Sequence, residues 1–248
     1  KFKKKNKLIY IMKLLKSIIL IYTILTMLEW YIHKYLMHKT DNKFIDNKNK
    51  YFKKTYKYFH NKNQDIAHIN HHKKVDTNGE VLEDENGMYF DITNVPLLFI
   101  SAFIFYFVIS LLLKFNHSKN EYKCIFIIFV IISVIYYKLW NFLHPRFHKY
   151  KYLDDSEISN NYIYNKLKKY HLLHHFNKGN NKCNFNIILP GADTLFNTYK
   201  GCVDNSDFCN DNSIEKSMND IGLCDKQKNN IELPGGLTYC NNSKKINL

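Results

Sequence analysis

Long apolar runs alternate with polar stretches rich in lysine and asparagine along this 248-residue chain. Three such runs occupy residues 8–32, 96–115 and 124–140. Because a helix needs about 20 apolar residues to cross the hydrocarbon core of a bilayer, each run predicts a membrane helix. Lys13 and Lys16, in the first run, are expected to reach back to the interface. A signal peptide is the alternative for that run, but no small-residue cleavage site follows it.

The second and third runs are joined by a short polar link at residues 116–123, which predicts a helical hairpin over residues 96–140. A hairpin returns the chain to the side of the membrane that it left. The polar segments before and after the hairpin are therefore expected to share one face of the membrane, and the link is expected on the opposite face.

Ten of the twelve histidines fall into four clusters, which are two HxxHH motifs and two looser pairs. Positions i, i+3 and i+4 of a helix lie within about 100° of one another, so an HxxHH motif places three imidazoles on one face. Neutral imidazole binds first-row metals well. We therefore interpret these ten residues as metal ligands: His33, His38, His68, His71, His72, His144, His148, His171, His174 and His175.

Ten ligands are too many for one ion that has about four to six coordination places, so the pattern predicts two ions. Hairpin topology places all four clusters on the same membrane face. His60 lies in a polar loop and His117 lies in the link on the opposite face, so neither is expected to bind metal.

In order, the clusters read HX4H, HX2HH, HX3H and HX2HH around hydrophobic segments, which resembles the fatty acid hydroxylase superfamily. That family contains sterol desaturases and fatty-acid and sphingoid-base hydroxylases. Residues 184–198, NFNIILPGADTLFNT, resemble its closing block NFG…P..D..FGT, although Asn186 and Asn197 replace glycines. The resemblance covers residues 29–201.

This resemblance implies an O2-dependent oxidoreductase with two iron ions, which hydroxylates a fatty acyl chain or a sphingolipid. The alternative within the family is a sterol desaturase similar to the C5-desaturases. Electrons are expected from an external donor such as cytochrome b5 with its NADH- or NADPH-linked reductase, because the chain has no flavin or haem motif. The Glu-x-x-His motif of soluble di-iron enzymes is also absent.

Two readings outside lipid oxidation compete with this one. A histidine-rich divalent-metal transporter would place ligands inside its helices near the bilayer midplane, whereas the clusters here lie beyond the apolar runs. A catalytically inactive scaffold would tolerate lost ligands, yet all ten are present. Both features favour the enzyme.

Composition supports a membrane rather than a nucleic acid as partner. The net charge is +14 and 46% of the residues are hydrophobic, but Arg146 is the single arginine, so no array of arginines exists for phosphate or base contacts. Basic residues surround the later histidine clusters, which predicts that the histidine face is cytosolic. The resemblance to the fatty acid hydroxylase superfamily implies the endoplasmic reticulum as the membrane. The basic start KFKKKNK would then lie on the lumenal side, unless the first segment is shallow or re-entrant.

Metal-bound histidines usually donate their second ring N–H to a carboxylate or carbonyl. Asp193 is the main candidate for that role, with a helix cap or turn as its alternative. Tyr170 and Asn184 flank the ligands and are weaker candidates, for which packing is the alternative. Residues 76–87 contain two Asn-Gly turn signals and several acids, and we expect this loop to face water.

The expected fold is all-α: an integral membrane protein with a cytosolic, histidine-lined helical cap that holds two metal ions. Residues 1–32 form the N-terminal membrane segment, and residues 33–201 form the catalytic domain. Residues 202–248 are rich in Asn, Asp and Ser, which predicts a disordered tail. No CxxC motif occurs among the six cysteines, so free thiols are the default expectation.

Overall fold

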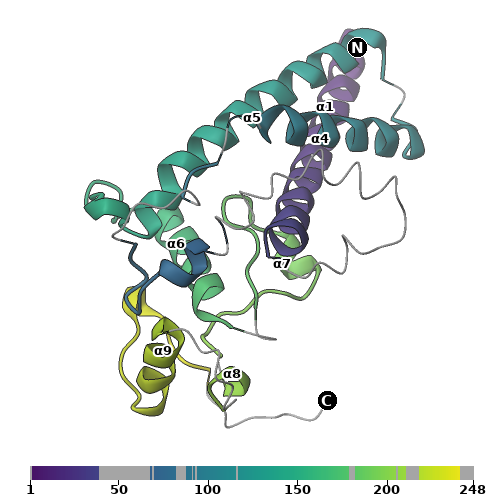
Figure 1. Cartoon of the computed structure of the whole chain (residues 1–248). Coiled ribbons are helices and arrows are strands. Elements are labelled where there is room, and N and C mark those ends of the chain that lie inside the picture. The colour runs from purple at the N-terminus through teal and green to yellow at the C-terminus, as the bar shows by residue number, and fades with distance from the viewer. Residues whose placement is uncertain are drawn as a thin grey trace, which may run out of the picture.

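A computed structural model describes residues 2–38, 68, 70–81, 88–90, 92, 94–115, 117–178, 182–204, 206–210 and 218–240. Within these ranges the protein is helical and has no strand, which confirms the all-α prediction (Figure 1). The helices are α1 (Phe2–Tyr31), η1 (Ile32–Met37), α4 (Asn94–Leu112), α5 (Lys119–Phe147), η3 (Tyr150–Tyr152), α6 (Tyr162–Phe176), α7 (Ala192–Leu195), α8 (Ser206–Asn210), α9 (Met218–Lys228) and η5 (Pro234–Gly236).

The three apolar runs become α1, α4 and α5, and they pack together around buried residues such as Ile21, Ala102 and Phe129. Among the described residues, two helices are long and apolar enough to cross a membrane, Ile11–Tyr35 and Lys119–Phe147, whereas the apolar helix Leu98–Leu112 from the second run is shorter. Their outer faces expose large apolar side chains. Helix α1 is unbroken from Phe2 to Tyr31, so the first apolar run does not turn back on itself.

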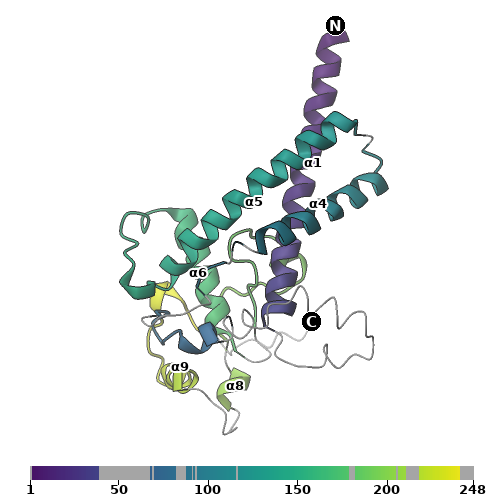
Figure 2. The same ribbon diagram turned by 45° about the horizontal axis from the view of Figure 1, so that its top comes forward.

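Side-chain contacts between α1 and the hairpin fix how the hairpin lies. A capping box formed by Ser118 and Glu121 starts α5, and Lys13 of α1 lies 3.8 Å from the Glu121 carboxylate. Tyr106 of α4 donates to Ser17 of α1 at 2.9 Å. The hairpin tip therefore lies beside the N-terminal half of α1, and the opposite ends of α1 and α5 are free to meet the cap (Figure 2).

A cap is built around α6 at the end of α5 that lies away from the hairpin tip (Figures 1 and 2). Asn161 caps α6 by accepting from the backbone N–H of Tyr164 at 3.1 Å. One side of α6 buries Tyr164 against Phe147 of α5. The other side buries Leu172, Leu173 and Phe176 against C-terminal residues of the cap: Val203, Leu223, Leu233 and Leu237.

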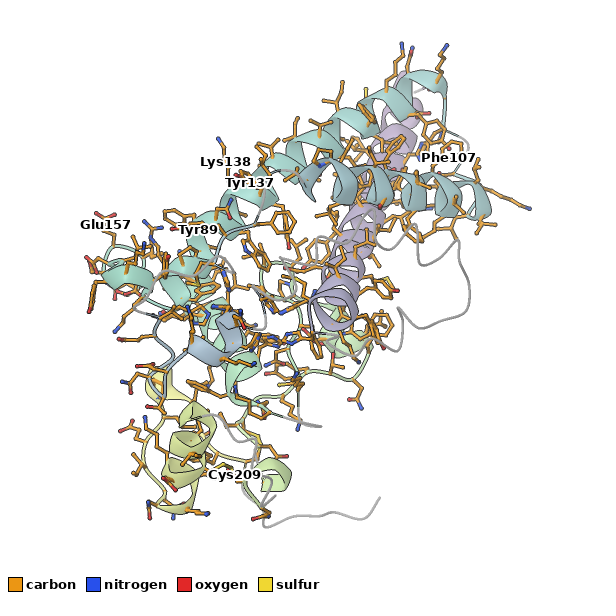
Figure 3. The ribbon with its side chains drawn as sticks, viewed as in Figure 1. Tyr89, Phe107, Tyr137, Lys138, Glu157 and Cys209 are labelled. Carbon is orange, nitrogen blue, oxygen red and sulfur yellow. A yellow bond between two sulfur atoms is a disulfide. The ribbon has the colours of Figure 1, made fainter. Side chains whose placement is uncertain are left out.

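This last contact overturns the prediction of a disordered tail for the described part of residues 202–248. Helices α8, α9 and η5 form there, and disulfides join Cys202 to Cys240 and Cys209 to Cys224, so free thiols are the wrong expectation for these four cysteines (Figure 3). The buried apolar residues are far apart in a polar sequence, so their pattern has no local period. The disulfides lower the conformational entropy of the unfolded chain, so a small apolar core is enough to keep this segment folded.

Candidate metal centre

All ten predicted histidines come together, in two adjacent groups of five. Within each group the potential ligand nitrogens lie within 4.8 Å of one another. The first histidine group comprises His33, His38, His68, His72 and His174. The second histidine group comprises His71, His144, His148, His171 and His175.

Each HxxHH motif supplies ligands to both groups. His171 and His175 are one helical turn apart on α6 and enter the second group, whereas His174 enters the first. The earlier motif is divided the opposite way, because His68 and His72 enter the first group and His71 enters the second. Rings of His72 and His175 stack at 4.0 Å between centroids, so the two groups touch.

A π-helical turn brings the HX4H pair together. In an α-helix, residues five apart point about 140° away from each other. The turn at Ile32–Met37 has the i→i+5 hydrogen bonding of a π-helix, which places residues five apart on one face. His33 and His38 consequently meet, with their Nε2 atoms 3.2 Å apart.

Backbone carbonyls hold four of the histidines by Nδ1. His33 donates to the Phe185 oxygen at 2.6 Å, and His174 donates to the Cys183 oxygen at 2.6 Å. His144, on α5, donates to the Met88 oxygen at 2.7 Å. A neutral ring that donates from Nδ1 carries its lone pair on Nε2, so these contacts aim lone pairs into the groups.

The fourth of these contacts comes from Gly79, in the loop that was expected to face water. That expectation is wrong for Gly79, which is buried and whose carbonyl oxygen accepts from His148 Nδ1 at 2.8 Å. Residues 82–87 of the loop lie outside the described residues. The predicted Asn-Gly turn does form, with Gly79 at φ +82° and its N–H donating to the Asp76 oxygen. A Cβ on Gly79 would lie 2.6 Å from a methyl of Leu172, so glycine allows the turn to approach α6.

The donor set fits a metal cation. Nε2 of His38 lies 2.9 Å from Nε2 of His174 and 3.2 Å from Nε2 of His33. The Nε2 atoms of His174 and His33 both carry lone pairs, and the His38 ring can offer at most one proton to the two of them. In the second group, Nε2 of His71 and of His144 is buried and has no hydrogen-bond partner in the described structure. Converging, unsatisfied lone pairs of this kind are stabilised by a cation.

Ligand spacing also suits one ion in each group. Nitrogens bound at about 2.1 Å on opposite sides of an ion lie about 4.2 Å apart, which is close to the 4.8 Å limit found here. Burial lowers the pKa of His171 and His175 well below the usual value, and neighbouring histidines lower it further. Both rings are therefore neutral at pH 7, which is the form that binds metal.

The two groups differ in access. All five rings of the second histidine group are buried, whereas His38 and His72 of the first group are partly exposed. Among the histidines that were not expected to bind metal, His117 lies at the far end of the helices, 2.9 Å from the Tyr106 hydroxyl, and His60 lies outside the described residues.

Asp193 does not hold a histidine directly, so its main predicted role is wrong. Its buried carboxylate accepts from the backbone N–H groups of Phe185 at 2.9 Å and Asn186 at 2.7 Å, and from the Thr198 hydroxyl at 2.6 Å. Phe185 in turn accepts from His33, so Asp193 acts on the centre through the loop.

Tyr170 and Asn184 have structural roles, in agreement with their alternative interpretation. Tyr170 stacks on Tyr199 with 5.0 Å between ring centroids. Asn184 has φ +52° and exchanges two hydrogen bonds with the backbone of Lys200. Among described contacts, neither side chain bonds to a histidine ring.

The sequence analysis missed Glu29, which is buried one helical turn before His33. Its carboxylate accepts from the Tyr136 hydroxyl at 3.0 Å and from the Asn186 side chain at 3.2 Å. It also accepts from three consecutive backbone N–H groups, those of Ile187, Ile188 and Leu189. The sequence did offer a signal for this role, because Glu29 is a lone acid inside an apolar run and lies four residues before a predicted ligand.

No known family model, curated protein or solved structure matches the chain. The resemblance to the fatty acid hydroxylase superfamily therefore rests on the histidine spacing and on residues 184–198. The four histidine clusters themselves meet in space.

Proposed function

We propose that this protein is a membrane-bound, O2-dependent di-iron enzyme that hydroxylates a fatty acyl chain or a sphingolipid. The observation that carries this proposal is the convergence of ten histidines into two groups of five at one end of the apolar helices. Sterol desaturation is the alternative reaction, because it would use the same ligand set.

Each histidine group would hold one iron ion, and an iron pair supplies O2 activation strong enough to oxidise an unactivated C–H bond. The chain orients its ligands through the carbonyls of Gly79, Met88, Cys183 and Phe185. Burial of the second group excludes water, and partial exposure of His38 and His72 leaves an approach to the first group.

A lipid substrate is supported by where the centre lies. Helices Ile11–Tyr35 and Lys119–Phe147 carry His33 and His144 near their ends. If these helices cross a bilayer, the polar end of a lipid reaches the centre from the interface while its acyl chain stays among the helices. A water-soluble substrate would not need a centre at the ends of apolar helices, so this placement favours a lipid.

Electrons would come from a separate donor such as cytochrome b5 with its reductase, in the endoplasmic reticulum membrane. We place the histidine face on the cytosolic side, because lysines surround the later clusters. The two disulfides lie on the same face and are typical of oxidising compartments, so they favour the lumenal side. Occupancy of the two native N-x-S glycan acceptors, Asn116 and Asn241, separates these orientations.

The decisive test is lipid profiling of cells that express wild-type protein, His174→Ala or no protein. We expect lipids hydroxylated at position 2 or 4 to appear only with the wild type. A changed sterol profile instead would establish the desaturase. Identical profiles in all three, with both proteins present in membranes and the wild type loaded with iron, would overturn the enzyme.

A further inference from the structure

The loop after the last histidine cluster lies along α1, inside the stretch that is long enough to cross a membrane. Tyr22 donates to the Pro190 oxygen at 2.5 Å, and Thr26 donates to the Leu189 oxygen at 2.6 Å. Trp30 stacks on Phe196 with 4.2 Å between ring centroids. Residues 22, 26 and 30 follow one face of α1 over about 12 Å, so the loop tip reaches well along the helix Ile11–Tyr35.

Buried side chains satisfy the backbone N–H groups of this loop. Those of Ile187, Ile188 and Leu189 donate to Glu29, and those of Phe185 and Asn186 donate to Asp193, as described above. Side chains also satisfy the backbone N–H groups at the start of α7. The N–H of Ala192 donates to the Thr26 hydroxyl at 3.2 Å, and the N–H of Asp193 donates to the Asn186 side chain at 3.0 Å.

A water-exposed loop has no need for such an arrangement, because water satisfies its backbone. Non-helical backbone at membrane depth is tolerated only where protein groups satisfy it. The loop also exposes apolar surface beside α1. Leu195 is 65% exposed, and Phe196, which stacks on Trp30, is 39% exposed.

We propose that residues 186–196 form a membrane-embedded loop whose outer surface contacts the acyl region of lipids, and that Glu29 holds this loop at that depth. The inference rests on the proposed membrane location of the protein and deepens it. A lipid surface is the partner that fits, because Leu195 and Phe196 of the loop expose apolar side chains and so does α1, on which the loop packs. Polar Asn197 and Lys200 follow directly and mark the interface.

This loop joins the lipid-facing surface to the metal centre. Residue 185 precedes its first residue and supplies the carbonyl that orients His33. The first histidine group, which is the accessible one, therefore lies at the inner end of an element whose outer end touches lipid. An acyl chain that follows this surface arrives at the accessible group rather than at the buried one.

Depth-dependent fluorescence quenching tests the proposal in the full chain, reconstituted in phosphatidylcholine vesicles that contain doxyl-labelled lipid. Cys124, the exposed free thiol, is replaced by Ser, and an environment-sensitive fluorophore is attached to Leu195→Cys. Two matched positions serve as controls. Ile104→Cys on α4 is 56% exposed on the apolar helices, and Ile221→Cys on α9 is 47% exposed at the distal part of the cap (Figure 2).

We expect lipid quenching at Leu195→Cys comparable to that at Ile104→Cys, and none at Ile221→Cys. Quenching at Ile104→Cys alone would overturn the embedded loop and leave the membrane location standing. Absence of quenching at both Leu195→Cys and Ile104→Cys would instead refute the membrane location on which the loop depends.

Discussion

His33 and Phe185 are joined by a hydrogen bond of 2.6 Å from the imidazole Nδ1 to the backbone oxygen, across 152 positions of sequence. This bond connects the end of the first apolar helix to the loop after the last histidine cluster. Glu29 and Asp193 fix that loop by accepting from its backbone. The orientation of a ligand in the first histidine group thus depends on two buried carboxylates that belong to neither histidine group.

Replacing His174 by Ala should remove a ligand from the first histidine group. We expect lipid oxidation to fall to background and the metal content to fall from two ions per chain to one or fewer, because the neighbouring rings are held by helices and carbonyls. Metal analysis of the purified protein measures this. His117→Ala is the matched control, since that ring lies at the opposite end of the helices, and it should keep both ions.

A result of one ion or none in fully loaded wild type would contradict the two-ion prediction. Loss of activity in His117→Ala would contradict the hairpin topology. Membrane insertion must be measured in each variant, because metal binding also contributes to folding.

The Gly79→Ala substitution should destabilise the second histidine group through His148. Backbone strain at φ +82° costs about 1–3 kcal/mol, and the added Cβ also meets Leu172 at 2.6 Å. Gly236→Ala is a control with φ +66° and no atom within 4 Å of the new Cβ. Thermal unfolding should show a larger loss for Gly79→Ala, together with reduced metal content. Equal effects would mean that the close approach to α6 is unimportant.

Substitution of Glu29 by Gln should weaken the loop without removing bulk. One carboxylate oxygen becomes an NH2 group, which faces donors from Leu189 or Ile188 and leaves a buried N–H without an acceptor. We expect a loss of stability of about 1–3 kcal/mol and weaker metal binding in the first group. Glu157→Gln, on the exposed connection between α5 and α6, is the control (Figure 3). If the two variants unfold alike, Glu29 does not hold the loop.

Orientation can be determined from two native N-x-S acceptors, Asn116 in the hairpin link and Asn241 directly after Cys240. Their described neighbours, His117 and Cys240, lie at the hairpin tip and in the cap, which the proposed topology puts on opposite faces of the membrane. We expect a glycan on Asn116 and none on Asn241, read as a mobility shift that disappears in Asn116→Gln. The reverse result would place the histidine face in the lumen, where the disulfides of the cap would also form readily.

Helices and ligands could be predicted from the sequence because their signals are local. Apolar run length predicted α1, α4 and α5, and histidine spacing predicted which rings meet. Their division between two groups could not be predicted, because it depends on the π-helical turn at Ile32–Met37 and on how α6 packs. The backbone carbonyls that accept from the histidine rings could not be predicted either, since every residue type has a carbonyl. The folded tail was missed because its buried leucines follow no period.

The division of each HxxHH motif between the two groups has a consequence for assembly. The first HxxHH motif and helix α6 each contribute to both groups, so ordering either group also orders ligands of the other. Binding of the first ion therefore reduces the loss of conformational entropy that accompanies binding of the second ion, so the two ions bind cooperatively. In a metal titration the half-loaded species should be scarce, and the protein should pass from empty to fully loaded in one transition.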